Sequence, residues 1–469
     1  MNYSGRLENF EGDRMKVLTL FILYTVFLST VLAQLEIYGL EDKTITSLAL
    51  SSDRAYPGKF IVAGTDSNGL FIHHLTDSSN SWFQMGFDRR TVTAVFVQQR
   101  GWGPVEVSTI FAAVKPDSSI GDSTLIYSND SPVQSFWSRA DSGLNRNEIK
   151  RIVSFAGFDY SGHEPPMPIF CCAENPHIYS FQFDHWTKIW SGDELTVMQC
   201  LFSDDGIVWG GGWFYGFGTT LLFVKSSDYG QNWEEFSSDL GIIFNCFSLA
   251  TTPGYPDTLY AGLNGTVVKS TDGGKTWDYT SLTNKPANFY GLVVHPAEPE
   301  HVHAGGYDES NQFVLFESMN GGESWVEIVP PINSKIAGIT SMVGTILNDE
   351  FLLLIGTNGT GIYRILEKIT FLKDQDVKYF ERGFSLFQNY PNPFNPNTTI
   401  EFDVPKTSDV RLKIFNVLGD EVATLVSDRL PAGTYSYEWS RPVGTASGIY
   451  LYRLQAGEYV ETRKMMLIQ

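Results

Sequence analysis

The chain has 469 residues, a length that favours two or three domains over one. Its formal net charge of −20 excludes nucleic acid as a partner, because neutralising phosphates requires a basic surface. With 43 glycines, 14% aromatic residues and no long amphipathic helical pattern, the composition favours an all-β protein with many tight turns.

The N-terminal segment 1–33 is typical of an export signal. Lys16 precedes the apolar run 17–32, and Ala33 closes a plausible cleavage site. Met15 is the more natural start, because acidic residues precede it. The alternative is a transmembrane anchor, since the run is almost long enough to span a bilayer. No second hydrophobic span follows, so we expect no transmembrane span after cleavage.

The four cysteines are Cys171, Cys172, Cys200 and Cys246. None has C-x-x-C spacing, so neither a zinc site nor a thioredoxin-type pair is indicated. All four lie in or beside apolar runs, which predicts buried free thiols. A disulfide between Cys200 and Cys171 or Cys172 is the alternative, because the expected compartment is oxidising.

Apolar strands that end in a small-residue turn recur at 60–64, 258–262, 301–305 and 353–356. Three of the repeated units also contain the pattern S-x-[D/N]-x-G-x-x-W, and we call these segments the boxes. The Asp or Asn oxygen is expected to accept backbone N–H groups across a tight turn, the Gly to allow positive φ, and the Trp to pack between sheets. We therefore predict a structural and not a catalytic role. The box residues are Ser226, Asp228, Gly230 and Trp233; Ser270, Asp272, Gly274 and Trp277; and Ser318, Asn320, Gly322 and Trp325.

The boxes resemble the Asp-box, or bacterial neuraminidase repeat, of sialidases and sortilin-type receptors, and this resemblance implies a β-propeller. Degenerate copies at 76–82, 128–137 and 184–190 extend the series. The tryptophans at 82, 137, 190, 233, 277 and 325 are separated by 55, 53, 43, 44 and 48 positions, a period that suits four-stranded blades. A last unit, 336–366, lacks a box, and segment 35–40 is expected to supply its missing strand and close the ring. We predict an all-β chain with a seven-bladed β-propeller over 34–366, with six or eight blades as alternatives.

A charged linker, 367–383, precedes a change in composition. The segment 390–396, Tyr-Pro-Asn-Pro-Phe-Asn-Pro, is expected to be rigid and extended. Short alternating strands follow, so we predict a small Ig-like β-sandwich over 384–469.

This C-terminal module resembles the type A sorting domain of the type IX secretion system. The resemblance rests on the Pro-rich lead, on Asn-Val-Leu-Gly at 416–419 and on scattered motif residues. It implies a secreted or cell-surface protein of a Gram-negative bacterium, with the type IX machinery as a partner. The alternative is an Ig-like adhesive domain without a sorting role. The motif residues are Pro391, Asn392, Pro393, Gly433, Tyr435, Gly448, Tyr450, Lys464 and Met465.

A sialidase requires three arginines to hold its substrate carboxylate. This chain has no arginine between Arg151 and Arg364, which disfavours that activity. An extracellular glycoside hydrolase of another Asp-box family needs two facing carboxylates, and acidic pairs occur at 193–194 and 308–309. We interpret these acids as solvated surface groups, with the hydrolase as the alternative function.

His301 and His303 alternate onto one strand face, a spacing that suits metal ligation. A sister repeat has Thr258 and Tyr260 at these positions, so we predict no metal and no cofactor.

The segment 210–218 combines four aromatic residues with five glycines and is expected to form an exposed loop. Aromatic side chains on a loop are typical of binding hot spots. We therefore predict a non-catalytic module that binds a glycan or a surface protein, with Trp213 and Tyr215 as a stacking platform and Phe214 and Phe217 beside them. The alternative is that this loop plugs the central channel.

Overall fold

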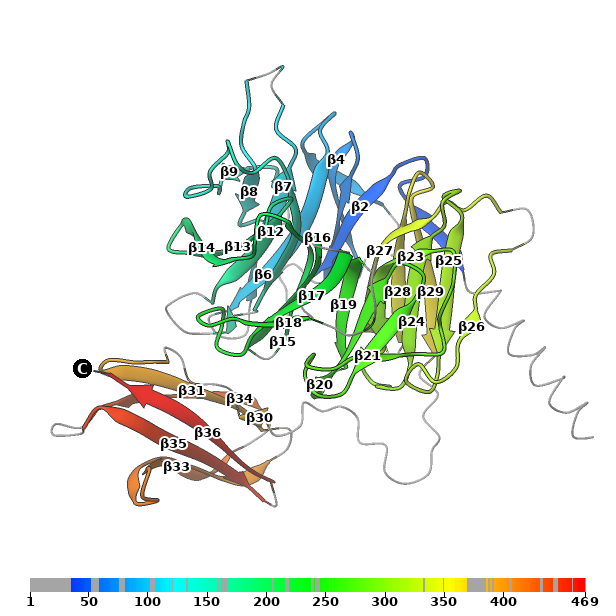
Figure 1. Ribbon diagram of the computed structural model, residues 1–469. Coiled ribbons are helices and arrows are strands. Elements are labelled where there is room, and N and C mark those ends of the chain that lie inside the picture. Colours follow the sequence, from blue (N-terminus) through cyan, green and yellow to red (C-terminus); the bar gives the residue numbers. More distant parts are fainter. Residues whose placement is uncertain are drawn as a thin grey trace, which may run out of the picture. The chain divides into compact units, whose positions relative to one another are not determined.

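The computed structural model describes residues 35–468 apart from 52–58, 76–80, 102–105, 118, 120, 132–133, 159, 162–166, 205, 216–218, 238–239, 241–244, 253, 332–333, 349, 369–384, 387–388, 390–391, 405–406, 431–432, 442–445 and 458. The expected signal segment lies outside the described residues, as does most of the expected linker. Strands account for all regular elements in the described part (Figure 1), which confirms the all-β prediction. No helix there has the length and apolar character that crossing a bilayer requires.

Two compact units make up the chain, and the strands of the second begin at β30. Seven sheets form the first unit within the described residues, six of them four-stranded and one five-stranded. In chain order, their strands are β2 (Ile45–Leu50), β3 (Phe60–Thr65), β4 (Gly69–His74), β5 (Phe83–Gly86); β6 (Val92–Gly101), β7 (Glu106–Val114), β8 (Ile126–Asn129), β9 (Ser138–Arg139), joined by β11 (Tyr160–Ser161); β10 (Ile152–Gly157), β12 (Ile169–Ala173), β13 (His177–Gln182), β14 (His185–Ser191); β15 (Thr196–Asp204), β16 (Ile207–Tyr215), β17 (Thr219–Ser226), β18 (Glu234–Ser237); β19 (Cys246–Thr252), β20 (Tyr255–Leu263), β21 (Val267–Ser270), β22 (Asp278–Tyr279); β23 (Asn288–Val294), β24 (Val302–Tyr307), β25 (Phe313–Ser318), β26 (Val326–Glu327); and β27 (Ile339–Leu347), β28 (Glu350–Thr357), β29 (Ile362–Lys368), joined by β1 (Glu36–Gly39).

The second strand of each sheet carries a nearly continuous apolar run, because it is covered on both faces. Every residue of β3 and β12 is buried. Glycines in these strands allow the next sheet to approach. A Cβ on Gly64 would lie 2.9 Å from Val92, and a Cβ on Gly356 would lie 2.6 Å from Ile45. The small residues predicted to form turns therefore lie inside strands, and close packing between sheets is the reason for them.

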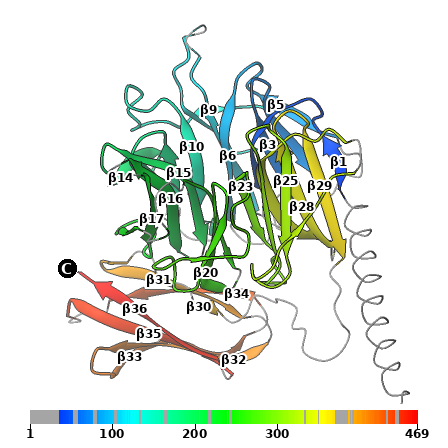
Figure 2. The ribbon, with the colours of Figure 1, turned by 45° about the vertical axis from the view of Figure 1, so that its right-hand side comes forward.

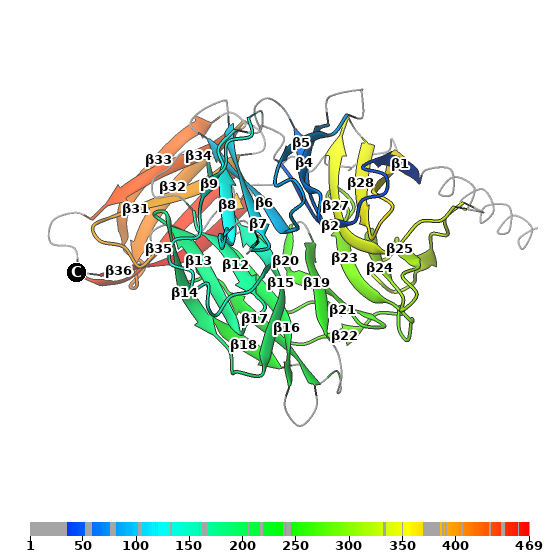
Figure 3. The ribbon, with the colours of Figure 1, turned by 90° about the horizontal axis from the view of Figure 1, so that it is seen from above.

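The first strands of consecutive sheets contact one another. These contacts run from β2 through β6, β10, β15, β19, β23 and β27, and β27 contacts β2. Figure 3 shows β27 beside β2, although they lie at opposite ends of this unit in the sequence. A serine hydroxyl repeats at three of these junctions. Ser47 accepts the N–H of Val95 at 3.2 Å, Ser154 that of Leu201 at 3.1 Å, and Ser341 that of Leu48 at 3.2 Å. The junction of β27 with β2 thus uses the same contact as junctions between sheets adjacent in sequence.

The expected pairing of the N-terminal segment with the last unit is present. β1 pairs antiparallel with β29 as the outer strand of that sheet (Figure 2). Glu36 lies opposite Arg364 in the register, and their side chains form a 2.8 Å ion pair. Apart from the parallel pair β11–β6, the paired strands of the first unit run antiparallel, and the sheets have a propeller-like arrangement.

The second unit is a sandwich of a three-stranded and a four-stranded sheet around one core. Phe402 and Trp439 from one sheet and Leu412, Tyr452 and Met465 from the other are buried in this core. Its strands are β30 (Ser385–Leu386), β31 (Asn397–Val404) and β34 (Gly433–Ser440), and β32 (Ser408–Asn416), β33 (Glu421–Leu430), β35 (Gly448–Ala456) and β36 (Tyr459–Leu467).

Candidate functional site

The three boxes adopt one hydrogen-bonded turn. In the second box, Ser270 Oγ accepts the N–H of Gly274 at 2.9 Å and donates to Asp272 Oδ1 at 2.9 Å. Asp272 Oδ1 also accepts the N–H groups of Lys275 and Thr276, at 3.0 and 2.9 Å. Gly274 has φ +93°, a backbone conformation that favours glycine. These bonds connect residues within the turn, as expected of a structural element.

The other two boxes repeat these bonds. Ser226 and Ser318 each accept the N–H of their box glycine at 2.8 Å. Asp228 Oδ1 accepts the N–H of Asn232 at 2.8 Å, and Asn320 Oδ1 accepts that of Ser324 at 2.9 Å. An amide oxygen therefore replaces the carboxylate without changing the turn, which argues against acid–base chemistry at this position.

The tryptophans connect neighbouring sheets. Trp277 stacks on Phe223 of the preceding sheet, with ring centroids 4.2 Å apart. Upstream, Trp82 Nε1 donates to Tyr38 O at 2.9 Å and Trp137 Nε1 to Met85 O at 2.7 Å.

In the third sheet, the tryptophan that contacts the preceding sheet is Trp186, whereas the spacing predicted Trp190. Trp186, which is buried, donates to Ala140 O of the preceding sheet at 2.6 Å, whereas Trp190 donates to Glu235 of the following sheet at 3.0 Å. The prediction of Trp190 was wrong because β13 and β14 are joined by the tight turn at Phe183 and Asp184, both with positive φ, and no box-length loop separates them.

A lysine precedes two of the boxes and reaches the box of the next sheet. Lys225 Nζ donates to Gly273 O at 3.2 Å, and Lys269 Nζ donates to Gly321 O at 3.1 Å. Each lysine also lies over an aromatic ring of its own sheet, that of Trp209 or Tyr260. Glu317 occupies the corresponding place before the third box.

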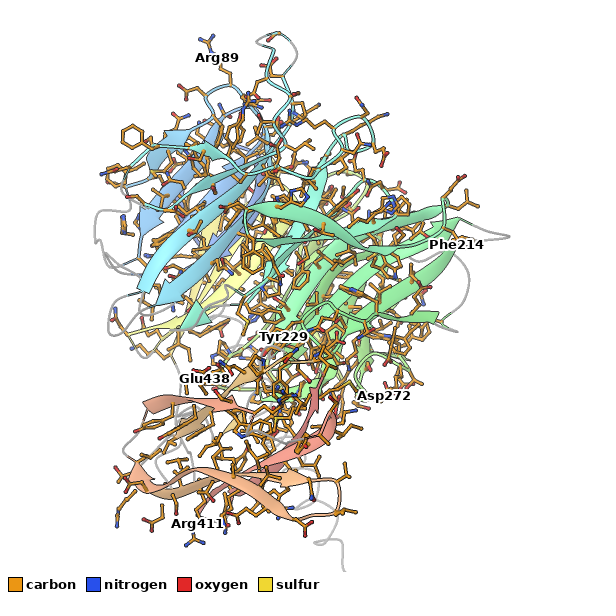
Figure 4. The ribbon with its side chains drawn as sticks, turned by 90° about the vertical axis from the view of Figure 1, so that its left-hand side faces the viewer. Arg89, Phe214, Tyr229, Asp272, Arg411 and Glu438 are labelled. Atoms are coloured by element: carbon orange, nitrogen blue, oxygen red, sulfur yellow. The ribbon has the colours of Figure 1, made fainter. Side chains whose placement is uncertain are left out.

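The glycine-rich segment predicted as a loop is a strand through Tyr215, and Phe217 lies outside the described residues. The glycines again serve close packing, since a Cβ on Gly211 would lie 2.5 Å from Cys246 Sγ. Trp213 and Phe214 are half-buried at the end of β16. Figure 4 labels Phe214 there and Asp272 in the second box. Because strands alternate in direction, the end of β16 belongs to the edge of the sheets opposite the boxes.

Three neighbouring aromatic rings, which we call the aromatic stack, belong to the same edge and were missed by sequence reasoning. Tyr290 at the start of β23 stacks on Tyr307 at the end of β24, with centroids 4.7 Å apart and planes at 11°. The ring of Phe247, at the start of β19, is tilted by 44° against that of Tyr290, with centroids 4.7 Å apart. All three are half-buried. Burial, together with the hydrogen bond to Tyr307, raises the pKa of Tyr290. The sequence signal that could have revealed them is that all three lie near the ends of strands.

The acidic pairs considered for hydrolysis lie in turns. Asp193 and Glu194 are exposed between β14 and β15. Asp308 accepts the N–H groups of Ser310 and Gln312, both at 2.9 Å, and so stabilises the turn after β24.

His301 and His303 lie beside the buried Glu317 and the half-buried Glu367, and we call these four residues the His–Glu cluster. His301 Nε2 is 2.7 Å from Glu317 Oε1, and His303 Nε2 is 3.3 Å from Glu367 Oε1. Burial alone would lower the pKa of His301, but the bond to Glu317 and the nearby carboxylates outweigh it and raise that pKa. Burial would raise the pKa of Glu367, but the adjacent imidazole of His303, with those of His301 and His295, lowers it. The sequence suggested the histidines; it gave no sign of their glutamate partners.

The four cysteines are buried and free. Cys200 lies next to Cys246, with sulfur atoms 3.6 Å apart, and forms no disulfide with Cys171 or Cys172. Burial raises the pKa of Cys171, Cys172 and Cys246 well above the usual value.

In the second unit, the Pro-rich lead is bonded to the C-terminal strand. Asn392 Oδ1 accepts the N–H of Met466 at 2.8 Å, and Phe394 N–H donates to Met466 O at 2.9 Å. Pro393 is exposed, and Pro391 lies outside the described residues. The Tyr450 hydroxyl donates to Ala446 O at 2.8 Å.

Several other motif residues of this unit occupy strands. Gly433 and Tyr435 lie in β34, Gly448 and Tyr450 in β35, and Lys464 and the buried Met465 in β36.

The turn 416–419 presents apolar side chains to solvent. Asn416 Oδ1 accepts the N–H groups of Leu418 and Asp420, at 3.0 and 2.9 Å, and Gly419 has φ +88°. Val417 is 67% exposed and Leu418 is 84% exposed.

Comparisons with known proteins identify the C-terminal module. Its residues 388–469 match the family described as the secretion system C-terminal sorting domain. The sequence matches none of the curated proteins with which it was compared. Among solved structures, an ancestral GH74 enzyme matches with a TM-score of 0.48 and 14% identity over 72% of this chain, which spans 49% of that enzyme's length. The computationally designed protein Ika8 matches with a TM-score of 0.42 and 11% identity, over 69% of this chain and 96% of the designed one. This chain therefore carries a secretion-system sorting domain, which indicates a secreted or cell-surface protein.

Proposed function

We propose that this protein is exported by the type IX secretion system and that its first unit is a non-catalytic module that binds a glycan or a surface protein. The match of residues 388–469 to the sorting domain carries the export part of this proposal. The segment 1–33 would direct the first step, across the inner membrane, as a cleaved signal peptide.

The binding unit in this proposal is a closed seven-bladed propeller of the Asp-box type. Support comes from the repeated turn bonds of the boxes, from the pairing of β1 with β29 and from the contact of β27 with β2. Closure packs the last sheet against the first, so that neither is left with an exposed apolar face, which suits a protein that must stay soluble outside the cell.

The edge opposite the boxes is the proposed ligand face. Trp213 and Phe214 at the end of β16 and the stack of Phe247, Tyr290 and Tyr307 place five aromatic rings at strand ends of three consecutive sheets. Rings that are apolar on their faces and, in Trp and Tyr, polar at one edge are suited to stacking on a sugar or a peptide. The bonds within the boxes leave their carboxylates engaged in turns, which supports placing the ligand elsewhere.

A binding and turnover screen tests the module's role. The purified mature chain would be applied to a glycan array and to a panel of bacterial surface proteins, and also incubated with a panel of glycosides. We expect a saturable ligand without turnover. Hydrolysis of a glycoside that is abolished by Asp193→Asn or Asp308→Asn would contradict this proposal and show that the first unit is a hydrolase.

A further inference from the structure

The His–Glu cluster differs from its counterparts in the preceding sheets in a way that points to a ligand. Tyr260 lies two residues before Gly262 and opposite Lys269 in the register, and both side chains donate to Gly321 O of the next box. His303 lies two residues before Gly305 and opposite Glu317. The sheet β23–β26 thus has a histidine–glutamate pair where the preceding sheet has an aromatic–lysine pair. The next sheet, β27–β29, has no box that could accept a hydrogen bond from a lysine.

The four side chains converge on one point between two sheets. His301 directly precedes β24, His303 lies in β24 and Glu317 lies in β25, whereas Glu367 comes from β29 of the next sheet. Their ligand atoms all lie within 4.8 Å of one another. The imidazole nitrogens lie 2.7, 3.3, 3.7 and 3.9 Å from the carboxylate oxygens. A tetrahedral ion with ligands at about 2.0–2.1 Å separates its ligand atoms by about 3.3–3.4 Å, which lies inside this range.

His303 supplies an independent observation. Its side chain is fully buried, at 0% exposure. Nε2 lies 3.3 Å from Glu367 Oε1, but neither ring nitrogen makes a hydrogen bond of normal geometry. A buried polar group without a well-formed hydrogen bond is costly, and an imidazole in this state is available as a ligand. Glu317 is also nearly buried, at 6% exposure, and two carboxylates in such a place need positive charge nearby.

His301 has the support that metal-binding histidines have in other proteins. Its Nδ1 lies 3.4 Å from Glu298 Oε2, while Nε2 faces the cluster. Donation of Nδ1–H to a carboxylate fixes the tautomer that leaves Nε2 free to bind a cation. The ring of His295 stacks on His301, with centroids 5.3 Å apart and planes at 7°, and so restrains its orientation.

We propose that His301, His303, Glu317 and Glu367 bind one divalent transition-metal ion of the zinc class, which joins the sheets of β23–β26 and β27–β29. Two imidazole nitrogens and two carboxylate oxygens suit Zn²⁺ and its first-row neighbours, whereas Ca²⁺ takes six to eight oxygens and Mg²⁺ usually keeps several waters. Four protein ligands complete a tetrahedral set, so the ion has a structural role. In this position it replaces the link that Lys225 and Lys269 make to the boxes of their neighbours.

Metal analysis of the mature full-length chain is the primary test. The protein would be treated with a chelator, incubated with Zn²⁺, dialysed and analysed for bound metal, and a second sample would be titrated with Co²⁺. We expect roughly one ion per chain, the strong visible absorption of tetrahedral cobalt, and a melting temperature that rises with Zn²⁺ and falls with chelator. If the protein neither retains zinc nor shows the cobalt spectrum, the proposal is overturned. The His–Glu cluster is then an imidazolium–carboxylate ion pair.

Variants assign the ligands. His303→Leu introduces the residue found at the corresponding position of β28, Leu354, and Glu367→Gln changes the partly exposed ligand with little change in volume. Both should lose the zinc-dependent rise in melting temperature, and Glu298→Gln should weaken zinc binding about 10–100-fold. Glu327→Gln, on the exposed strand β26, is the control and should bind like the wild type. Unchanged zinc binding in Glu367→Gln and in folded His303→Leu would place the ion elsewhere and contradict the proposal.

Discussion

Lys269 donates a hydrogen bond from Nζ to the carbonyl oxygen of Gly321, at 3.1 Å, and so connects one sheet to the box of the next. Its side chain is half-buried, and the ring of Tyr260 lies beneath it. Lys269→Met keeps the apolar part of the side chain and removes the donor. We expect a loss of about 1 kcal/mol in the free energy of unfolding, measured by urea denaturation. Lys275→Met, in the exposed part of the second box, is the control, and an equal loss there would contradict a specific link.

The carboxylate of Asp272 organises the second box. Asp272→Ala removes the acceptor for two backbone N–H groups and should lower the free energy of unfolding by about 1–2 kcal/mol. Asp272→Asn retains Oδ1, as Asn320 does in the third box, and should cost much less. Asp278→Ala, on an exposed strand, provides the baseline. Ligand affinity of the folded Ala variant should equal that of the wild type; a large loss of binding at unchanged stability would show a functional box.

The same carboxylate predicts a dependence on acid. Burial acts to raise the pKa of Asp272, but the hydrogen bonds from Thr276, Ser270 and Lys275 outweigh it and lower the pKa from 3.8 to about 2. Because the folded-state pKa is the lower one, the contribution is complete above pH 3.8 and is lost as the pH falls toward 2. The stability difference between wild type and Asp272→Ala should therefore shrink over this interval. A difference that stays constant between pH 5 and pH 2 would contradict this assignment.

Local patterns allowed the boxes to be predicted, because each turn is determined by residues within eight positions of one another. The series failed at Trp190, where a two-residue turn replaces the box and Trp186 makes the contact between sheets. Residues 210–215 were misinterpreted as a loop because three consecutive glycines are typical of turns. Here they are required by neighbouring strands: a Cβ on Gly212 would collide with Val197 O.

Long-range partners were beyond the reach of these patterns. Glu317 and Glu367 lie 50 positions apart (367 − 317) on strands of different sheets, so their convergence on His303 depends on the packing of the sheets. The aromatic stack of Phe247, Tyr290 and Tyr307 has the same origin, since Phe247 and Tyr290 belong to different sheets. Only assembly of the sheets brings such side chains together.

The proposed ligand face can be tested by truncating its aromatic side chains. Replacing Trp213 and Tyr215 together with Ala should abolish ligand binding, while the melting temperature barely changes. Phe183→Ala is a matched control, because Phe183 is 73% exposed on the turn between β13 and β14, at the box edge. A double variant that loses stability but keeps its affinity per folded molecule would favour the alternative that this segment plugs the channel.

The exposed turn of the sorting domain offers a further test. Val417 and Leu418 are apolar and project into solvent, which is typical of a contact with a partner. Replacing both with Ser should reduce the extracellular fraction of the protein severalfold without lowering its melting temperature. Val460→Ser, 56% exposed on β36, should be exported normally. Normal export of the double variant would place recognition on another part of the domain.

Deletion of residues 384–469 tests the account most directly. In a Gram-negative host that has a type IX secretion system, the amounts of the full-length and truncated chains would be measured in the periplasm, on the cell surface and in the medium. The account predicts that the truncated chain remains folded, as judged by resistance to proteolysis, and accumulates in the periplasm, whereas the full-length chain reaches the surface or the medium. Recovery of the truncated chain outside the cell in normal amounts would contradict the assignment of residues 388–469 as the export determinant.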